Sequence, residues 1–302
     1  MRISTAYAQS AAIDGISDRQ ARTLELQEQL ASTKRVNRPS DDPVAAAEAE
    51  RLRSRQARIA TEQRAAGYAR QVLSAADGAL GDADAALQSA RESLLSAGNA
   101  TASAGDRRTY AEQLRQVREQ LLSIANRRDG AGGFVFGGQG TRTAPIPTSG
   151  ATYLPQAGTQ RVGQELPATT SLDGRENFVA IPTSTGPMNI FAQLDAAIAV
   201  LENPAAAPAA VGAAATAGIG AIDVALERFS TTRTTVGERL KALDAHEQAL
   251  ENGSIDSSAR LSQLVDLDMA RGISEMVQSQ TALEAAMKSY AQVARLTLFD
   301  YL

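Results

Sequence analysis

Apolar residues return at every seventh position between residues 43 and 97. The first series comprises Leu52, Ile59, Ala66, Leu73, Leu80, Leu87 and Leu94, and a second series, three residues behind its later members, comprises Ala69, Ala76, Ala83, Ala90 and Ala97. Two apolar positions per seven residues are typical of a coiled-coil seam, and small residues at one of them let helix backbones approach closely. Ser40, Asp41 and Asp42 are candidate N-caps, and Pro43 suits the first helical position. The pattern predicts a long helix from about 43 to 97.

Further helices are predicted on both sides of the middle of the chain. After Asp106, a candidate cap, apolar residues alternate four and three apart at Tyr110, Leu114, Val117, Leu121 and Ile124. The later segments carry Ile190, Leu194, Ile198 and Leu201, and then, at intervals of seven, Ile222, Phe229, Val236, Leu243 and Leu250, with Ile219, Leu226 and Leu240 at companion positions. Since a short connection joins the first two helices, we expect them to pack antiparallel.

The two ends of the chain carry weaker helical patterns. Ile13, Ile16, Leu24 and Leu30 mark the first, and Met276, Leu283 and Tyr290, spaced by seven, mark the last, while Gln20, Gln27 and Gln280 are read as seam residues. Polar seam residues lower coiled-coil stability, and such helices are marginal alone. We therefore expect the ends to order against each other or against neighbouring subunits. The apolar tail at 296–302 also favours a partner.

Residues 132–187 have a different texture, in which glycines and prolines separate short apolar runs such as 134–136 and 177–181. This pattern predicts a small β-rich module. The expected fold is mainly α: an elongated antiparallel coiled-coil or helical-bundle rod, built from N- and C-terminal parts, with the β-rich domain inserted. The expected divisions are terminal helices at 1–38 and 254–302, long helices at 39–130 and 188–253, and the insertion at 131–187.

Composition narrows the functional classes. The 302 residues include 30 Lys plus Arg and 34 Asp plus Glu, interspersed along the chain, so no uniform basic field favours nucleic acid. Cysteine is absent, which excludes thiolate chemistry and disulfides. The first 20 residues do not predict a secretory signal peptide, and the uncharged stretch 203–222 is too rich in Ala, Gly and Pro for a convincing membrane span. We expect neither nucleic acid nor membrane as a partner.

Short motifs at both ends resemble a known family. The motif Asn37, Arg38, Pro39, Ser40, Asp41, Asp42, Pro43, which follows a start of Met1-Arg2-Ile3-Ser4-Thr5, resembles the flagellin and hook-associated family. Near the C-terminus, 266–270, 280–286 and 298–302 are similar to the hook-filament junction members of that family, and 133–138 resembles the entry to their insertion.

The resemblance implies a structural subunit of the bacterial flagellum and not an enzyme. Such subunits are exported by the flagellar type III system with a dedicated export chaperone, and they polymerise as a ring between the first hook-associated protein and flagellin. Their terminal helices form an inner tube, their long helices the next shell, and their insertion projects outward. No catalytic, cofactor or metal residues are expected. The residues expected to carry assembly are Ile3, Ile13, Leu24, Met276, Leu283, Tyr290, Leu298 and Phe299, although the internal ones could instead bury only their own helix pair.

Other candidate sites have plainer interpretations. Asp41 and Asp42 are better explained by helix capping than by catalysis, and His246 stands without a neighbouring ligand pattern. The glycines at 137–140 lack the Gly-Lys-Ser or Gly-Lys-Thr of a nucleotide-binding loop.

Three alternatives to the junction role stay open. The first is flagellin itself, which typically carries Asp-Asp-Ala-Ala-Gly where this chain has Asp-Asp-Pro at 41–43. The second is a cytosolic coiled-coil adaptor, which would explain the heptads but not the terminal motifs. The third is an enzyme carried by the insertion, which shows no convergent acid, base and nucleophile.

Overall fold

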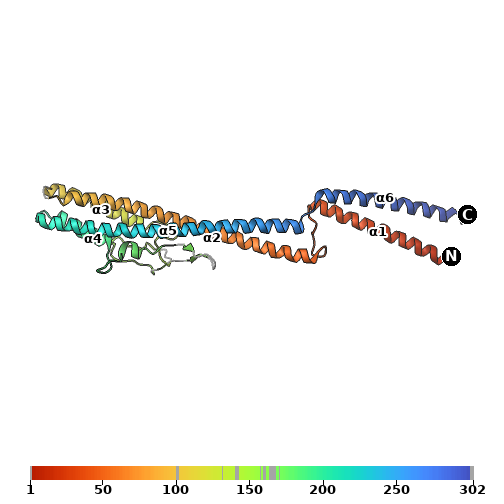
Figure 1. The fold of residues 1–302 in the computed structure, drawn as a ribbon, viewed down its shortest axis with the longest axis horizontal. Helices are drawn as coiled ribbons and strands as arrows, with labels where there is room; N and C mark the ends of the chain where they lie inside the picture. The colour runs from red at the N-terminus through yellow and green to blue at the C-terminus, as the bar shows by residue number, and fades with distance from the viewer. Residues whose placement is uncertain are drawn as a thin grey trace. The chain divides into compact units, whose positions relative to one another are not determined.

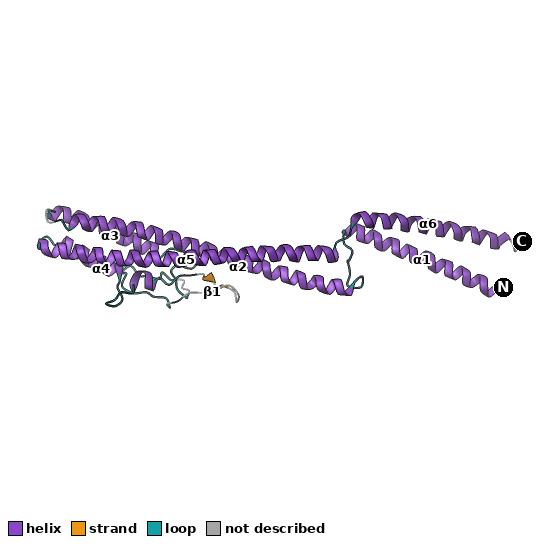
Figure 2. Cartoon of the chain, viewed as in Figure 1, coloured by secondary structure: helices purple, strands orange, loops and turns teal. Residues whose placement is uncertain are grey.

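The computed structural model describes residues 2–99, 102–130, 132–139, 143–156, 158, 161–162, 168–169 and 171–299. Its helices are α1 (Arg2–Ser32), α2 (Pro43–Ala97), α3 (Ala104–Ala125), α4 (Ile190–Glu202), α5 (Pro208–Val265) and α6 (Met269–Phe299), as Figures 1 and 2 show. A π-helical turn, η1 (Arg175–Val179), and two short strands, β1 (Arg161–Val162) and β2 (Ala168–Thr169), complete the described elements. The prediction of a mainly helical fold is confirmed. The chain divides into two compact units, Met1–Ala60 with Glu251–Leu302, and Thr61–Leu250.

The second unit is a bundle of antiparallel helices. α2 pairs with α5 through an ion pair between Arg91 Nε and Asp223 Oδ1 at 3.0 Å, and with α3 through Ser93 Oγ, which donates to Gln113 Oε1 at 3.0 Å. α3 packs in turn against α4. Both predicted heptad series of α2 are buried: of their members between residues 66 and 97, none is more than 1% exposed. The period of seven in α2 therefore marks the face that is buried in the structure.

Apolar side chains from the segment between α3 and α4 pack into the core of this bundle. Phe178 of η1 is fully buried, with its ring centroid 5.2 Å from that of Phe136, 5.3 Å from Phe229 on α5 and 6.4 Å from Phe191 on α4. An aromatic cluster of this kind buries a large area with few residues. The segment between α3 and α4 thus contributes to the core of the second unit.

The described residues do not support the prediction of a β-rich inserted domain. Among the described residues of 131–187, regular strand pairing is limited to the two-residue strands β1 and β2, together with isolated bridges such as the one between Ile181 and Met188. The apolar runs that indicated strands instead supply Phe136 and Phe178 to the helical core, and the glycines form the turns between these contacts. These apolar side chains are therefore buried against helices and need no sheet to exclude them from water.

By length and composition, α5 could also cross a membrane, because an 18-residue window has a mean hydropathy of 1.7. Along this helix, however, Val211, Ile222 and Phe229 are buried in the second unit. Core helices of soluble bundles have the same composition, so this stretch is weak evidence for a span.

Candidate assembly site

α1 and α6 form an antiparallel pair in the first unit. Gln9 Nε2 donates to the hydroxyl of Tyr290 at 3.2 Å, and the hydroxyls of Thr23 and Ser279 lie 2.9 Å apart. At the closed end of the pair, Leu267 N–H donates to the carbonyl oxygen of Thr33 at 3.0 Å. The two helices therefore run side by side over most of their length.

The seam of this terminal helix pair, α1 with α6, differs from the predicted one. Gln20, Gln27 and Gln280 are exposed, whereas Thr23 is 7% exposed and is hydrogen-bonded to Ser279. The signal was present in the sequence, because Thr23 lies seven residues from both Ile16 and Leu30. A buried polar pair of this kind fixes the register of two helices.

The residues expected to carry assembly fall into three groups. Met276, Leu283 and Tyr290 are half-buried on one face of α6. Ile13 and Leu24 are exposed on α1, at 47% and 60%. The side chains of Ile3, Leu298 and Phe299 lie outside the described residues.

A second row of apolar side chains on α6 was not predicted from the sequence, where the spacing of seven indicated Met276, Leu283 and Tyr290 instead. Met269, Ile273, Val277 and Met287 are between 42% and 56% exposed. At 3.6 residues per turn they occupy about a quarter of the helix circumference, next to the seam. We call these four residues the α6 row. Several exposed apolar side chains on one face of a helix are typical of an interaction site.

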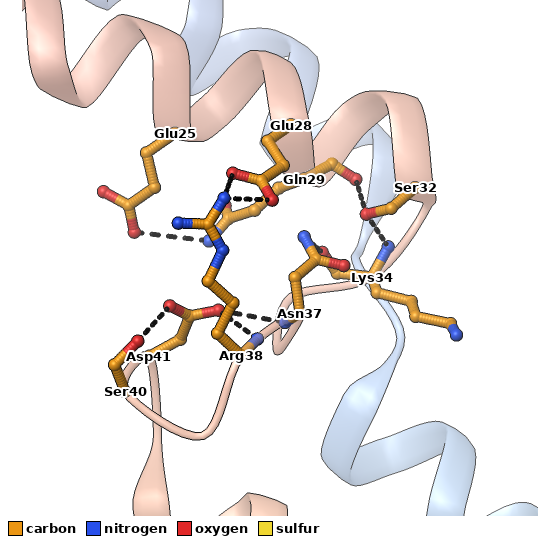
Figure 3. A network of polar contacts seen from close by, with 9 residues as sticks. All are labelled: Glu25, Glu28, Gln29, Ser32, Lys34, Asn37, Arg38, Ser40 and Asp41. Carbon is orange, nitrogen blue, oxygen red and sulfur yellow. Dashed lines mark hydrogen bonds and ion pairs between the residues drawn. The ribbon is translucent and has the colours of Figure 1, made fainter.

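The connection between α1 and α2 is held together by Asp41. Its Oδ2 accepts hydrogen bonds from the backbone N–H groups of Asn37 at 3.0 Å and Arg38 at 2.8 Å, as Figure 3 shows. These bonds, chiefly the one from Arg38, lower the pKa of Asp41 below its ordinary value. Asp41 therefore closes the loop, and it is Asp42 that caps α2, with its Oδ1 accepting from Ala45 N–H at 3.0 Å.

Two arginines tie this connection to the surrounding helices. Arg38 Nη2 donates to both carboxylate oxygens of Glu28 on α1, at 2.9 and 3.0 Å (Figure 3). Arg35 Nη1 donates to Asp42 Oδ2 at 3.2 Å, and its Nη2 donates to the carbonyl oxygen of Leu264 near the end of α5 at 2.7 Å. The Ala45 N–H and then Arg35 lower the pKa of Asp42. We call Glu28, Arg35, Arg38 and Asp42 the arginine clasp.

A groove of about 410 Å³ lies beside the arginine clasp. Its lining residues are Val36, Asn37, Arg38, Pro39, Pro43, Ala46, Ala47, Ala49, Glu50, Arg53 and Val265. Most of these side chains are small and apolar, so the groove presents few groups suited to chemistry.

The described residues offer little for catalysis or metal binding. Among them no group of three or more His, Asp or Glu side chains could hold a metal ion. His246 is half-buried on α5, and its Nε2 has no hydrogen-bond partner among the described residues. The exposed apolar side chains of the α6 row favour a surface for protein assembly.

Comparison with known proteins agrees with this interpretation. Residues 3–141 match the family model of the bacterial flagellin N-terminal helical region, and residues 219–302 that of the C-terminal helical region. The chain is 32% identical over 316 aligned positions to flagellar hook-associated protein 3 of Escherichia coli K12, covering 99% of both chains.

Solved structures show the same fold. A putative flagellar hook-associated protein from Vibrio parahaemolyticus superposes with a TM-score of 0.66 at 24% identity, over 75% of this chain and all of that one. The flagellar junction protein FlgL from Legionella pneumophila gives a TM-score of 0.59 at 20% identity, over 72% of this chain and all of that one. The chain belongs to the flagellin family and, within it, to the flagellar hook-associated protein 3 group.

Proposed function

We propose that this chain is a structural subunit of the bacterial flagellum, placed at the junction of hook and filament, and that it assembles through its terminal helix pair. The observation that carries the proposal is the α6 row, four apolar side chains 42–56% exposed on one stripe of α6. The full-length likeness to flagellar hook-associated protein 3 supports the place of assembly.

The terminal helix pair buries little by itself. On α1, Leu26 and Thr23 are the only described side chains that are buried, and Leu24 is 60% exposed. Two helices with so small a shared core gain little free energy from pairing. We infer that a second copy covers the α6 row, so that the pair becomes fully ordered only on assembly.

The partners follow from this role. Contacts between different faces of successive copies would build a helical ring, because heterologous contacts propagate from copy to copy. We propose that the ring joins the first hook-associated protein to flagellin. We also propose that the chain leaves the cell through the flagellar type III system, bound beforehand to an export chaperone that shields the terminal helices.

Deletion of the gene in its flagellated host tests the proposal. We expect electron microscopy to show hooks without filaments, and re-expression of the intact chain to restore filaments. Mass spectrometry of sheared flagella should find the chain in trace amounts relative to flagellin. A chain that dominates the preparation would be a filament subunit, and filaments that grow without it would refute the junction role.

The α6 row is tested by Val277→Asp, re-expressed in the deletion strain. A charge at a position that a second copy must desolvate should abolish filament attachment while leaving secretion into the medium intact. Ser274→Asp is the matched control, because Ser274 is an exposed polar residue on the same helix. Equal attachment in the two strains would show that the α6 row is not an interface.

A further inference from the structure

Four helix ends meet at the connections 33–42 and 266–268, and polar contacts link all four. Arg38 binds Glu28 near the end of α1, Arg35 binds the carbonyl oxygen of Leu264 near the end of α5, and Asp42 caps α2. The start of α6 is linked to the end of α1 by Leu267 N–H, which donates to the carbonyl oxygen of Thr33 at 3.0 Å. The arginine clasp is therefore the part of this junction that contacts three helices at once.

Two members of the arginine clasp, Arg35 and Asp42, alternate in sign with the helix ends beside them. The carbonyl end of α5 is partially negative and the N-terminus of α2 partially positive, because the peptide dipoles of a helix align. Arg35 lies against the first and Asp42 against the second, and the two side chains bind each other at 3.2 Å. Arg35 therefore lies between two negative groups and Asp42 between two positive ones, which fixes the order of these groups.

The neighbouring backbone is strained. Thr33, the residue that follows α1, has a φ of 58°, the left-handed region that a β-branched residue rarely adopts. Its carbonyl oxygen accepts from Leu267 N–H at 3.0 Å, and Arg35 N–H donates to the Val265 carbonyl oxygen at 2.7 Å. Strain of this kind persists only where surrounding contacts hold it.

Stability alone does not account for the contact between Arg38 and Glu28. Their side chains are 67% and 47% exposed, and ion pairs so open to water contribute little to the free energy of unfolding. Arg38 does, however, hold both oxygens of Glu28 through one nitrogen, Nη2, and so ties the connection to one position on α1. The geometry suits a role in orientation.

We propose that Arg38 and Arg35 are positioning residues, which set the direction in which the terminal helix pair leaves the connection and so present the α6 row to the next copy. The inference rests on the proposed junction function. It assigns a task to Glu28 and Arg35, which lie outside the 37–43 motif.

Charge exchange provides the first test, with flagella counted in the deletion strain. Arg38→Glu and Glu28→Arg should each lower the fraction of hooks that carry filaments by about fivefold. Without the ion pair, the terminal helix pair can leave the connection in several directions, of which only one presents the α6 row correctly. The double exchange should restore attachment, since it re-forms the ion pair with its polarity reversed. Arg35→Lys should also fail, because a lysine cannot bind Asp42 and the Leu264 carbonyl in one planar fork.

The matched control is Arg260→Glu. Arg260 lies in the same unit, is 62% exposed and, among the described residues, pairs within its own helix with Asp256 at 3.0 Å. We expect filament attachment as in the wild type. The midpoint of thermal unfolding of each secreted monomer should equal that of the wild type, which separates a positioning role from a role in folding. If Arg38→Glu does not fold, Arg38→Gln takes its place.

Distance measurement gives a readout that a stabilising role would not change. The chain has no cysteine, so Asp18→Cys on α1 and Arg55→Cys on α2, both at exposed positions, can carry a single pair of spin labels. The distribution of label distances should broaden in Arg38→Glu and narrow again in the double exchange.

The outcomes separate this inference from the proposed function. Filaments that grow after deletion of the gene would refute both. Filament loss on deletion, with Arg38→Glu indistinguishable from Arg260→Glu in attachment and label distances, would overturn the positioning role alone. A double exchange that fails to restore either readout would also overturn it.

Discussion

Asp41 and Asp42 are adjacent in the sequence, but their carboxylates act on opposite sides of the connection. Asp41 accepts from backbone N–H groups that precede it, while Asp42 accepts from the first turn of α2 and from Arg35. Both interactions favour the ionised form, so both pKa values lie below the ordinary 3.8 in the folded chain.

This difference makes the connection sensitive to acid. Because the folded-state pKa values are lowered, the stability that these groups contribute is present above about pH 3.8 and is lost as the pH falls through the folded values. We expect the variant Asp41→Asn/Asp42→Asn to lose less stability than the wild type between about pH 5 and pH 2. Urea unfolding followed by circular dichroism measures this, with Asp14→Asn on α1 as the control. Parallel pH profiles of variant and wild type would contradict the assignment.

Phe178 is the residue on which the core of the second unit depends most visibly. Its ring is fully buried and contacts three other phenylalanines. Phe178→Ala should lower the free energy of unfolding by about 3–5 kcal/mol, because it leaves a cavity among rigid neighbours. Leu154→Ala, at a side chain 59% exposed in the same segment, should change it by less than about 0.5 kcal/mol. Equal effects in urea unfolding would show that the segment does not belong to the core.

At the scale of elements, two glycines of α5 illustrate how helix packing decides the effect of one methyl group. A Cβ at Gly220 would meet no atom within 4 Å, whereas a Cβ at Gly218 would lie 2.8 Å from Leu94 Cδ1 on α2. Leu94 is fully buried, so its side chain has little room to move.

The two alanine substitutions should therefore change the free energy of unfolding in opposite directions. Gly220→Ala should stabilise the second unit by about 0.5–1 kcal/mol, because alanine is the better helix former. In Gly218→Ala the same gain is outweighed by overpacking, which typically costs about 1–3 kcal/mol. Urea midpoints of the two variants compare them directly. Stabilisation by both would mean that α2 and α5 are less closely packed around residue 218.

The elements also show what the sequence could predict. The helices α2 and α5 were predictable because a period of seven is local: Leu80 and Leu87 reveal their common face without knowledge of the rest of the chain. The segment between α3 and α4 was not, since Phe178 is buried by Phe229, which lies 51 residues further on, and a short apolar run looks the same whether it pairs with a strand or packs on a helix.

The candidate site divides in the same way. The 37–43 motif locates the connection, and the sequence predicts helix capping with Ser40, Asp41 and Asp42 as candidates, of which Asp42 caps α2. The partners of the arginine clasp were not foreseeable, because Arg35 and Leu264 are 229 residues apart in the sequence. The α6 row could have been found, since Met269, Ile273 and Val277 are spaced by four.

At the scale of the whole molecule, burial is distributed unevenly between the units. Most of the side chains excluded from solvent on α2, α3, α4 and α5 lie in the second unit, whereas described side chains of α1 and α6 are mostly exposed. Local opening costs least where few apolar contacts must be broken. The terminal helix pair should thus be the least stable part of the monomer.

Hydrogen exchange followed by mass spectrometry tests this distribution. In the monomer, amides of α1 and α6 should exchange at least about 100-fold faster than those of α2 between residues 73 and 94, because a difference of about 3 kcal/mol in opening free energy corresponds to that factor. In sheared flagella, the same amides of α1 and α6 should become protected, since a second copy would then cover the α6 row. Protection that is already complete in the monomer would mean that the terminal helix pair needs no partner, and assembly would have to be driven by other surfaces.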